Sequence, residues 1–316
     1  MPTLGVEYRF RVRRSVQLGG YAGGGWRGAF GHSFLPALCA TNATNCLAKR
    51  CSDPKDCSYY SLFERDRNQQ GENIPKPYVL GIPLDPSLFQ LVRDLSVGSS
   101  ASVVPPQLPE PFRLQATQVL ERTGPVFYGV GDLVRVRLLW LGATTAVEPA
   151  VTQHLRLHGL ACGGGQLELE GVDWSRWRPA PPLPAGTAQL RVTFLTPFCT
   201  RGTESDLESI ALRAPHVALV RAIKLAETFS GQVPKRLPFQ EFPADALRIT
   251  RSRLYRYEFE RASFRQQRRV PMWGIVGWME VEGDLNAAWP VLKAAEWLHA
   301  GKRATLGFGQ IEVIAI

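Results

Sequence analysis

The stretch Val6-Glu-Tyr-Arg-Phe-Arg-Val12 alternates apolar and charged residues with a period of two. This period is typical of a β-strand that turns its apolar side chains toward a core and its polar side chains the other way. Arg9, Arg11 and Arg13 occupy polar positions of the pattern. The sequence therefore predicts a first strand with one buried face and one basic face.

The pattern continues through the first part of the chain. A glycine-rich run at 19–25 precedes a helix predicted from about Trp26 to Cys39. Residues 133–141 repeat the alternation, with Arg135 and Arg137 on the polar side. Other segments are predicted as strands at 78–84, 112–120 and 166–172 and as a helix at 146–157.

A proline-rich segment follows at residues 178–186. It contains Pro179-Ala-Pro-Pro-Leu-Pro184, and proline at this density can neither pair in a sheet nor continue a helix. We interpret it as a linker. Beyond it the sequence predicts strands at 190–194, 249–259, 270–281 and 308–314 and helices at 215–229 and 287–300.

Both parts follow the order strand, helix, strand, strand, helix, strand, which is the order of a ferredoxin-like unit. The predicted fold class is therefore α+β, with two tandem ferredoxin-like (βαββαβ) domains at residues 1–183 and 184–316. A length of 316 residues suits two domains. The first domain is predicted to carry a cysteine-containing insertion at about residues 40–75.

Composition and charge narrow the class of partner. No apolar run is long enough for a signal peptide or a membrane span, so we expect a cytoplasmic protein with no membrane partner. The net charge is +9, and 30 of the 37 basic residues are arginine, whose planar fork suits phosphates and stacks on bases. This composition predicts a polyanionic partner. Arginine-rich codon usage is the alternative explanation.

One motif is misleading. Gly23-Gly-Gly-Trp-Arg-Gly28 matches the G-x-G-x-x-G pattern of dinucleotide-binding proteins. The strand before that motif should be apolar on both faces, because it lies in the centre of a parallel sheet. Here it carries Arg9, Arg11 and Arg13. We therefore reject a dinucleotide site.

Two basic segments predict contacts with RNA. In the glycine-rich segment Gly301-Lys-Arg-Ala-Thr-Leu-Gly-Phe-Gly309, glycines let the backbone approach a phosphate and two cations add donors. A helix cap followed by a turn explains Gly301 but leaves Gly307 and Gly309 unexplained. Residues 248–269 hold eight arginines and two acids, interleaved with aromatics, as in an RNA groove. A solvated hairpin is the alternative. The predicted groove residues are Arg251, Arg253, Arg256, Arg261, Arg265 and Arg268.

Cys39, Cys46, Cys51 and Cys57 fall within nineteen residues. Four thiolates can hold a structural zinc ion in tetrahedral geometry. The spacing lacks the C-x2-C pairs of common zinc modules, so reduced, free cysteines are the alternative.

Four stretches together resemble the CRISPR repeat-processing endoribonucleases of the RAMP (repeat-associated mysterious protein) superfamily. They are Arg27-Gly-Ala-Phe-Gly-His32, Cys57-Ser-Tyr-Tyr-Ser-Leu-Phe-Glu64, Gly274-Ile-Val-Gly-Trp-Met279 and the glycine-rich segment. The resemblance implies tandem ferredoxin-like domains that bind repeat RNA and cleave it without a metal ion. A non-catalytic RAMP subunit that holds guide RNA in a CRISPR effector complex, beside other subunits, is the alternative. An RNA-binding module unrelated to CRISPR is a third.

The resemblance also implies catalytic residues. A histidine in the region of His32 often serves this family as general acid or base, and histidine titrates near pH 6.5, which suits proton transfer. Arg27 would stabilise the phosphorane and Tyr21 would position the 2′-hydroxyl. His299, next to the glycine-rich segment, is the second choice for the acid or base.

Overall fold

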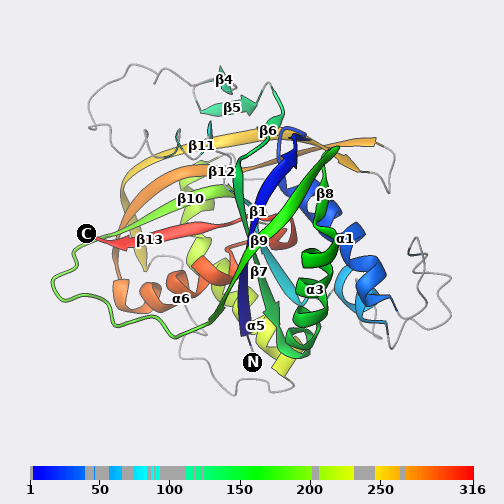
Figure 1. The fold of residues 1–316 in the computed structure, drawn as a ribbon. Coiled ribbons are helices and arrows are strands. Elements are labelled where there is room, and N and C mark those ends of the chain that lie inside the picture. The colour runs from blue at the N-terminus through cyan, green and yellow to red at the C-terminus, as the bar shows by residue number, and fades with distance from the viewer. Residues whose placement is uncertain are drawn as a thin grey trace.

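The computed structural model describes residues 3–39, 46, 57–65, 74–83, 87, 88, 90, 92, 112–116, 118–122, 124–200, 206–230, 246–263 and 268–316. For residues 112–116, 261–263, 268 and 269 it describes the backbone alone. Helices and mostly antiparallel sheets occur both in the first half (residues 1–183) and in the second half (184–316), so the predicted α+β class is confirmed (Figure 1).

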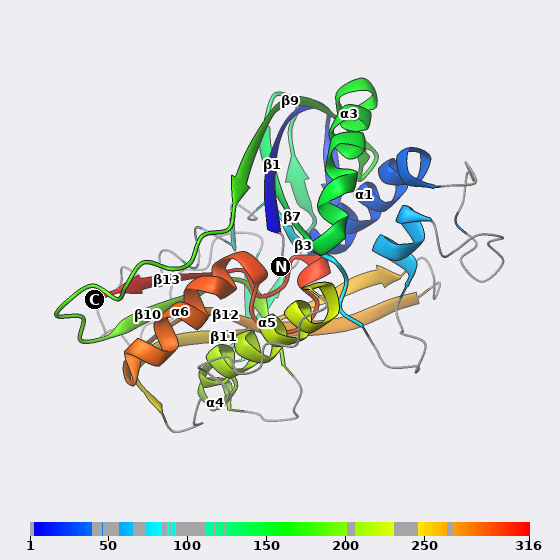
Figure 2. The same cartoon turned by 90° about the horizontal axis from the view of Figure 1, so that it is seen from below.

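The sheet of the first half has the strand order β3-β7-β1-β9-β8, and all neighbouring strands are antiparallel. Helices α1 (Gly23–Leu38) and α3 (Glu148–His158) lie on one side of it (Figure 2). The 3-10 helix η3 (Gly142–Val147) leads into α3, and β2 (Val16–Leu18) pairs with β6 (Val126–Tyr128) as a separate ribbon. The strands are β1 (Thr3–Arg14), β3 (Tyr78–Gly81), β7 (Leu133–Leu141), β8 (Leu160–Cys162) and β9 (Gly165–Arg176).

The alternating pattern of β1 builds the core of this half. Val6, Tyr8, Phe10 and Val12 are fully buried. The ring of Phe30 on α1 lies 6.5 Å, between centroids, from the rings of both Tyr8 and Phe10. Burial of each such side chain contributes about 1.5–3 kcal/mol, so this face of β1 holds α1 against the sheet.

Helix α1 begins at Gly23, earlier than the predicted start at Trp26, so the last three glycines of the run, at 23–25, are helical. Close packing explains them. A Cβ atom at Gly23 would lie 1.8 Å from the carbonyl oxygen of Leu306, and one at Gly25 would lie 2.5 Å from Leu18 Cδ2. The space available therefore decides the residue type, although glycine is a poor helix former.

The second half forms a six-stranded sheet with the order β13-β10-β12-β11-β5-β4. Helices α4 (Leu207–Leu212), α5 (Ala214–Ser230) and α6 (Leu285–Leu298) cover one face of it (Figure 2). Its strands are β4 (Phe112–Ala116), β5 (Val119–Arg122), β10 (Leu190–Phe198), β11 (Leu247–Ser263), β12 (Arg268–Gly283) and β13 (Ile311–Ala315).

The prediction of one strand at 112–120 was wrong. The segment forms the antiparallel hairpin β4–β5, and β5 pairs in parallel with β11 of the second half. The turn between the two strands interrupts the apolar pattern, and the pairing partner lies more than a hundred residues away. A local periodicity carries no information about that partner.

Two shared cores join the halves. One contains Val79, Leu139 and Leu141 of the first half together with Leu225 and Ala304 of the second. The other brings Leu88, Val92 and Leu120 of the first half onto Tyr255, Tyr257 and Phe259 of β11. The face of the second sheet that the helices leave uncovered is therefore not open along β11.

The proline-rich segment forms neither helix nor strand over residues 177–189. It lies against the second half, because Trp289 Nε1 donates a hydrogen bond to the carbonyl oxygen of Pro181 at 2.8 Å. Leu183 packs on the core below the helices. Among the helices that the structure describes, none combines the length and apolar character that a membrane crossing requires.

Candidate functional site

The glycine-rich segment lies between the two halves. Ala304 enters one shared core, and Leu306 and Phe308 enter the other, while Lys302 and Arg303 are exposed. Residues 304–306 form a short 3-10 helix, η4 (Ala304–Leu306). The segment therefore presents two cations at the boundary between the halves.

Its glycines have a packing reason. Gly301, Gly307 and Gly309 have φ angles of 84°, 77° and 70°, which favour glycine. A Cβ atom would lie 2.5 Å from the carbonyl oxygen of Cys199 at Gly301, 2.6 Å from Ile82 Cγ2 at Gly307 and 1.7 Å from the carbonyl oxygen of Ala300 at Gly309. Glycine is thus required at these three positions for the segment to pack against its neighbours in both halves.

The backbone amides of the segment are largely occupied by internal hydrogen bonds. The amide of Lys302 donates to Cys199 O at 3.0 Å, that of Gly307 to Ala304 O at 3.0 Å and that of Gly309 to Pro197 O at 3.0 Å. The expectation that these glycines bring free amides to a phosphate therefore receives no support here. The side chains of Lys302 and Arg303 are the exposed cationic donors of the segment.

The N-terminus of α1 meets the glycine-rich segment where Gly23 contacts Leu306. We call this place the junction. Arg27 lies one helical turn further on, is half-buried, and its Nε donates to the hydroxyl of Tyr78 on β3 at 3.3 Å. At a rise of about 1.5 Å per residue, Arg27 is about 6 Å along the axis from Gly23. Arg27 therefore lies on α1 one turn beyond the contact between Gly23 and Leu306.

His32 lies in the middle of α1 and is exposed. The helical rise puts it about 13 Å along the axis from Gly23. Gly28, one turn earlier on the same exposed face, has no atom of the described residues within 4 Å of a Cβ position. A ligand can therefore approach α1 between the junction and His32.

Tyr21 is placed unlike a residue that positions a substrate hydroxyl. Its ring packs on Phe259 and Phe308, with centroid distances of 4.8 and 4.9 Å, and its hydroxyl is buried. Burial raises the pKa of this phenol well above its ordinary value. The geometry assigns Tyr21 to packing between the halves.

His299, the second choice for the acid or base, is fully buried. Burial, together with the charges of Arg137 and Arg221, lowers the pKa of its imidazole to about 3. The ring is therefore neutral at physiological pH and has no access to RNA.

The arginines of β11 are partly paired. Glu280 accepts from Arg191 at 2.5 Å and lies 3.7 Å from Arg251, and both guanidinium groups lie over the ring of Trp278. Arg256 pairs with Glu258 at 2.6 Å and stacks 4.4 Å from the ring centroid of Trp273. Arg253 is half-buried. Arg265 and the side chains of Arg261 and Arg268 lie outside the described residues.

The aromatic residues of β11 do not offer a surface for stacking bases. Tyr255 and Tyr257 are buried, with 8% and 1% of their surface exposed, in the core shared with the first half. This corrects the expectation of arginines interleaved with exposed aromatics. The sequence pattern showed the alternation, but the segments that cover this face come from the other half.

The basic face of β1 is neutralised by the next strand. Arg9 lies 3.3 Å from Asp173, Arg11 forms two contacts of 2.9 Å with Glu170, and Arg13 lies 2.5 Å from Glu168. All three carboxylates belong to β9. Hydrogen bonding from Arg11 lowers the pKa of Glu170 below its ordinary value.

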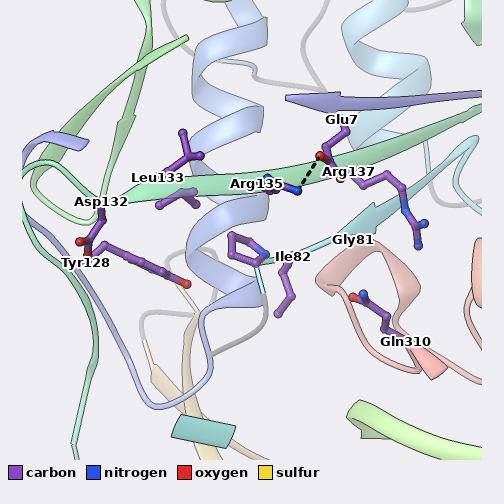
Figure 3. Close-up of a pocket in the computed structure, with 11 residues that line it drawn as sticks. Glu7, Gly81, Ile82, Tyr128, Asp132, Leu133, Arg135, Arg137 and Gln310 are labelled. Carbon is purple, nitrogen blue, oxygen red and sulfur yellow. Dashed lines mark ion pairs between the residues drawn. The ribbon is translucent and has the colours of Figure 1, made fainter. Parts of the chain in front are cut away.

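A cleft of about 590 Å³ lies between the halves, and the sequence did not identify the residues that line it. Figure 3 shows Arg135 of β7 and Glu7 of β1, paired at 3.9 Å, on one side and Gln310 of the second half on the other. Arg137 also lines it, and its Nη2 donates to the carbonyl oxygen of Glu296 at 3.0 Å. The arginines on the polar side of 133–141 were the only local signal.

Three of the four cysteines of the predicted zinc site lie among the described residues. Cys39 and Cys57 are buried in the core of the first half, and Cys46 packs against it. Cys51 and most of the predicted insertion lie outside the described residues. Within the described ranges, no group of three or more His, Cys, Asp or Glu side chains is arranged to hold a metal ion.

Two family models match different parts of the chain. Residues 192–311 match the family model of the CRISPR-associated endoribonuclease Cas6, and residues 1–98 match a model described as an N-terminal domain. No curated protein matches the sequence at a significant level.

Solved structures similar to the chain include two Cas6 product complexes. One, of Thermus thermophilus Cas6, is 13% identical with a TM-score of 0.55 over 99% of both chains. The other is 13% identical with a TM-score of 0.49 over 100% of both chains. A RAMP protein that binds different RNA substrates is 10% identical, with a TM-score of 0.46 over 98% of this chain and 99% of its own. The family match of residues 192–311 and the fold shared with Thermus thermophilus Cas6 confirm the resemblance of this chain to CRISPR repeat-processing endoribonucleases.

Proposed function

We propose that the protein is a CRISPR-associated endoribonuclease that binds repeat RNA of a precursor transcript and cuts it into guide RNAs. One observation carries the proposal. The residues that match the Cas6 endoribonuclease family include the glycine-rich segment, which carries exposed Lys302 and Arg303 and contacts the N-terminus of α1 through Leu306. Cations gathered at a boundary between two domains suit the binding of an RNA phosphate.

We also propose that residues 1–183 and 184–316 are tandem ferredoxin-like domains. Each half contains the succession strand, helix, strand, strand, helix, strand, with β8, β4–β5 and further short elements added. The four main strands lie in the order β9-β1-β7-β3 in the first sheet and β13-β10-β12-β11 in the second. In both sheets this is fourth, first, third, second, which supports a repeat of the same unit.

In the proposed reaction the 2′-oxygen of one nucleotide attacks the adjacent phosphorus, and the bond from phosphorus to the 5′-oxygen of the next nucleotide breaks. A base takes the proton of the 2′-hydroxyl, and an acid protonates the leaving 5′-oxygen. The products are a 2′,3′-cyclic phosphate and a 5′-hydroxyl. No metal ion takes part.

The residues of the junction suit these steps. Lys302 and Arg303 would neutralise charge on the phosphorane oxygens, with Arg27 as a further cation. His32, exposed on the same helix as Arg27, would transfer one of the two protons. The cleft beside Arg135 and the exposed arginines of β11 would hold flanking RNA.

A structural zinc ion on Cys39, Cys46, Cys51 and Cys57 is proposed as a separate feature, with no part in catalysis. Its support is the clustering of the four cysteines in the sequence, and Cys39 and Cys57 belong to one hydrophobic core against which Cys46 packs. About one equivalent of zinc in the purified protein would agree with this site. Metal-free protein with four titrating thiols would exclude it.

Incubation of pure protein with end-labelled CRISPR repeat RNA in EDTA tests the function. We expect one cut, with a 2′,3′-cyclic phosphate on one product and a 5′-hydroxyl on the other. Tight binding without a cut would instead select a non-catalytic subunit that holds guide RNA. Cleavage that requires added magnesium would contradict the metal-independent reaction.

A further inference from the structure

His299 takes a backbone conformation that few residues adopt. Helix α6 ends at Leu298, and His299 follows it with a φ of 60° in the left-handed region. Its Nδ1 lies 2.9 Å from the carbonyl oxygen of Phe308. Because a carbonyl only accepts hydrogen bonds, Nδ1 carries the proton and donates it to Phe308.

This hydrogen bond closes the glycine-rich segment at its base. Beside it, the amide of Ala300 donates to Gly309 O at 2.8 Å, so the two ends of the segment are joined by two adjacent bonds. Lys302 and Arg303 are exposed between these ends. The side chain of His299 thus helps to fix the position of both cations.

Two arginines enclose the same place. Arg221 of α5 donates from Nε to Leu298 O at 2.8 Å, and Arg137 of β7 donates from Nη2 to Glu296 O at 3.0 Å. Both bonds satisfy carbonyl groups that the end of α6 leaves without helical partners. Arg137 belongs to the first half, so this cap connects the glycine-rich segment to the sheet that lines the cleft.

We propose that His299 is a positioning residue, which holds residues 300–309 closed so that Lys302 and Arg303 meet the RNA phosphate. The inference rests on the proposed function. It differs from a role as acid or base, because the imidazole is buried and its Nε2 has no hydrogen-bond partner among the described residues.

Three substitutions separate the contributions of His299. In asparagine the amide nitrogen is bonded to Cγ, like Nδ1 of histidine, and asparagine tolerates positive φ. His299→Asn therefore keeps both the donor and the backbone conformation. His299→Gly keeps only the backbone conformation, and His299→Gln carries its amide one bond too far out. We expect RNA cleavage in single turnover to fall about tenfold or more for the Gly and Gln variants and to stay near the wild-type rate for Asn.

A second readout needs no RNA. Trypsin cuts after Lys302 and Arg303, and mass spectrometry of those peptides reports how open the segment is. We expect several-fold faster cutting there in the Gly and Gln variants, and the wild-type rate in Asn, at a temperature where circular dichroism shows all four proteins folded. If the Gln variant fails to fold, the Gly and Asn pair decides.

Wild-type cleavage and trypsin rates in the Gly variant would overturn the proposal. So would an Asn variant with a protected segment and no RNA cleavage, because the imidazole would then be needed for chemistry. If the wild-type protein leaves repeat RNA intact, the proposed function fails, while the trypsin comparison still decides whether His299 closes the segment.

Discussion

The arginines of β1 and those at the junction differ in what lies beside them. Arg9, Arg11 and Arg13 each lie within 3.3 Å of a carboxylate on β9. Arg303 lies over the ring of Phe308 and near the thiol of Cys199, and within the described ranges it has no carboxylate at ion-pair distance. Among Arg9, Arg11, Arg13 and Arg303, only Arg303 has no carboxylate at ion-pair distance within the described residues.

This difference shows why a count of arginines does not locate an RNA site. Where an acidic strand lies beside a basic one, the exposed charges form ion pairs, and each pair contributes about 0–1 kcal/mol to stability. An arginine in such a pair must exchange a carboxylate for a phosphate when RNA binds. Arg303 makes no such exchange, so we expect it to contribute more to RNA binding and catalysis in the proposed function.

The largest effect should follow loss of both exposed cations of the glycine-rich segment. The double variant Lys302→Ala, Arg303→Ala should lower the single-turnover cleavage rate by about 10²-fold or more, because the phosphorane charge loses its partners. The matched control is the double variant Arg11→Ala, Arg13→Ala, which removes the same charge from β1. Equal losses of cleavage rate in the two double variants would contradict the difference between β1 and the glycine-rich segment.

The next effect concerns His32. His32→Ala should cut single-turnover cleavage about 10²-fold while RNA affinity, measured by filter binding, stays nearly unchanged. His158→Ala, which removes an exposed histidine from α3, is the control and should leave both quantities unchanged. Normal cleavage in the His32 variant would move the acid or base to another group, with Arg27 and Arg303 tested next.

A smaller effect concerns the pH dependence of the free energy of unfolding that arises from His299. The imidazole of His299 has a pKa of about 3 in the folded protein, because it is buried beside Arg137 and Arg221. In the unfolded chain a histidine binds its proton near pH 6.5. Between these values the unfolded state holds more protons, so stability falls as the pH falls below about 6.5.

The expected loss from this group is about 2 kcal/mol between pH 7 and pH 5. Urea unfolding of the wild type and of His299→Asn at both pH values measures it. Other titrating groups contribute alike to both proteins, so the difference between the two slopes isolates His299. Parallel slopes would contradict the buried, neutral imidazole.

The smallest effect distinguishes two glycines of α1. Gly28→Ala should raise the free energy of unfolding by up to about 1 kcal/mol, because its exposed position is helical and a methyl group there touches nothing. Gly23→Ala should lower it, since the new Cβ would meet Leu306 O. Thermal unfolding compares the two variants. A stabilising alanine at Gly23 would contradict the close contact at the junction.

Local patterns predicted much of this molecule. The alternation in β1 and β7 identified Val6, Tyr8, Phe10, Val134 and Val136 as core, because each strand has helices on one side only. The glycine-rich segment and the likeness to a known family identified the region of Lys302 and Arg303. These features depend on short stretches of sequence.

What the sequence could not show depends on contacts between distant segments. Glu168, Glu170 and Asp173 neutralise β1 across more than 150 residues. Tyr255 and Tyr257 are buried because segments of the first half cover them. Gly23 and Gly307 lie so close to Leu306 and Ile82 that a Cβ atom would clash, and local spacing predicts neither neighbour.

The most direct test is photo-crosslinking of repeat RNA that carries 4-thiouridine beside the cut, followed by mass spectrometry of the linked peptides. We expect crosslinks to residues 24–32 of α1 and to the glycine-rich segment. Crosslinks confined to the arginines of β1 or to β11, with none at the junction, would contradict it.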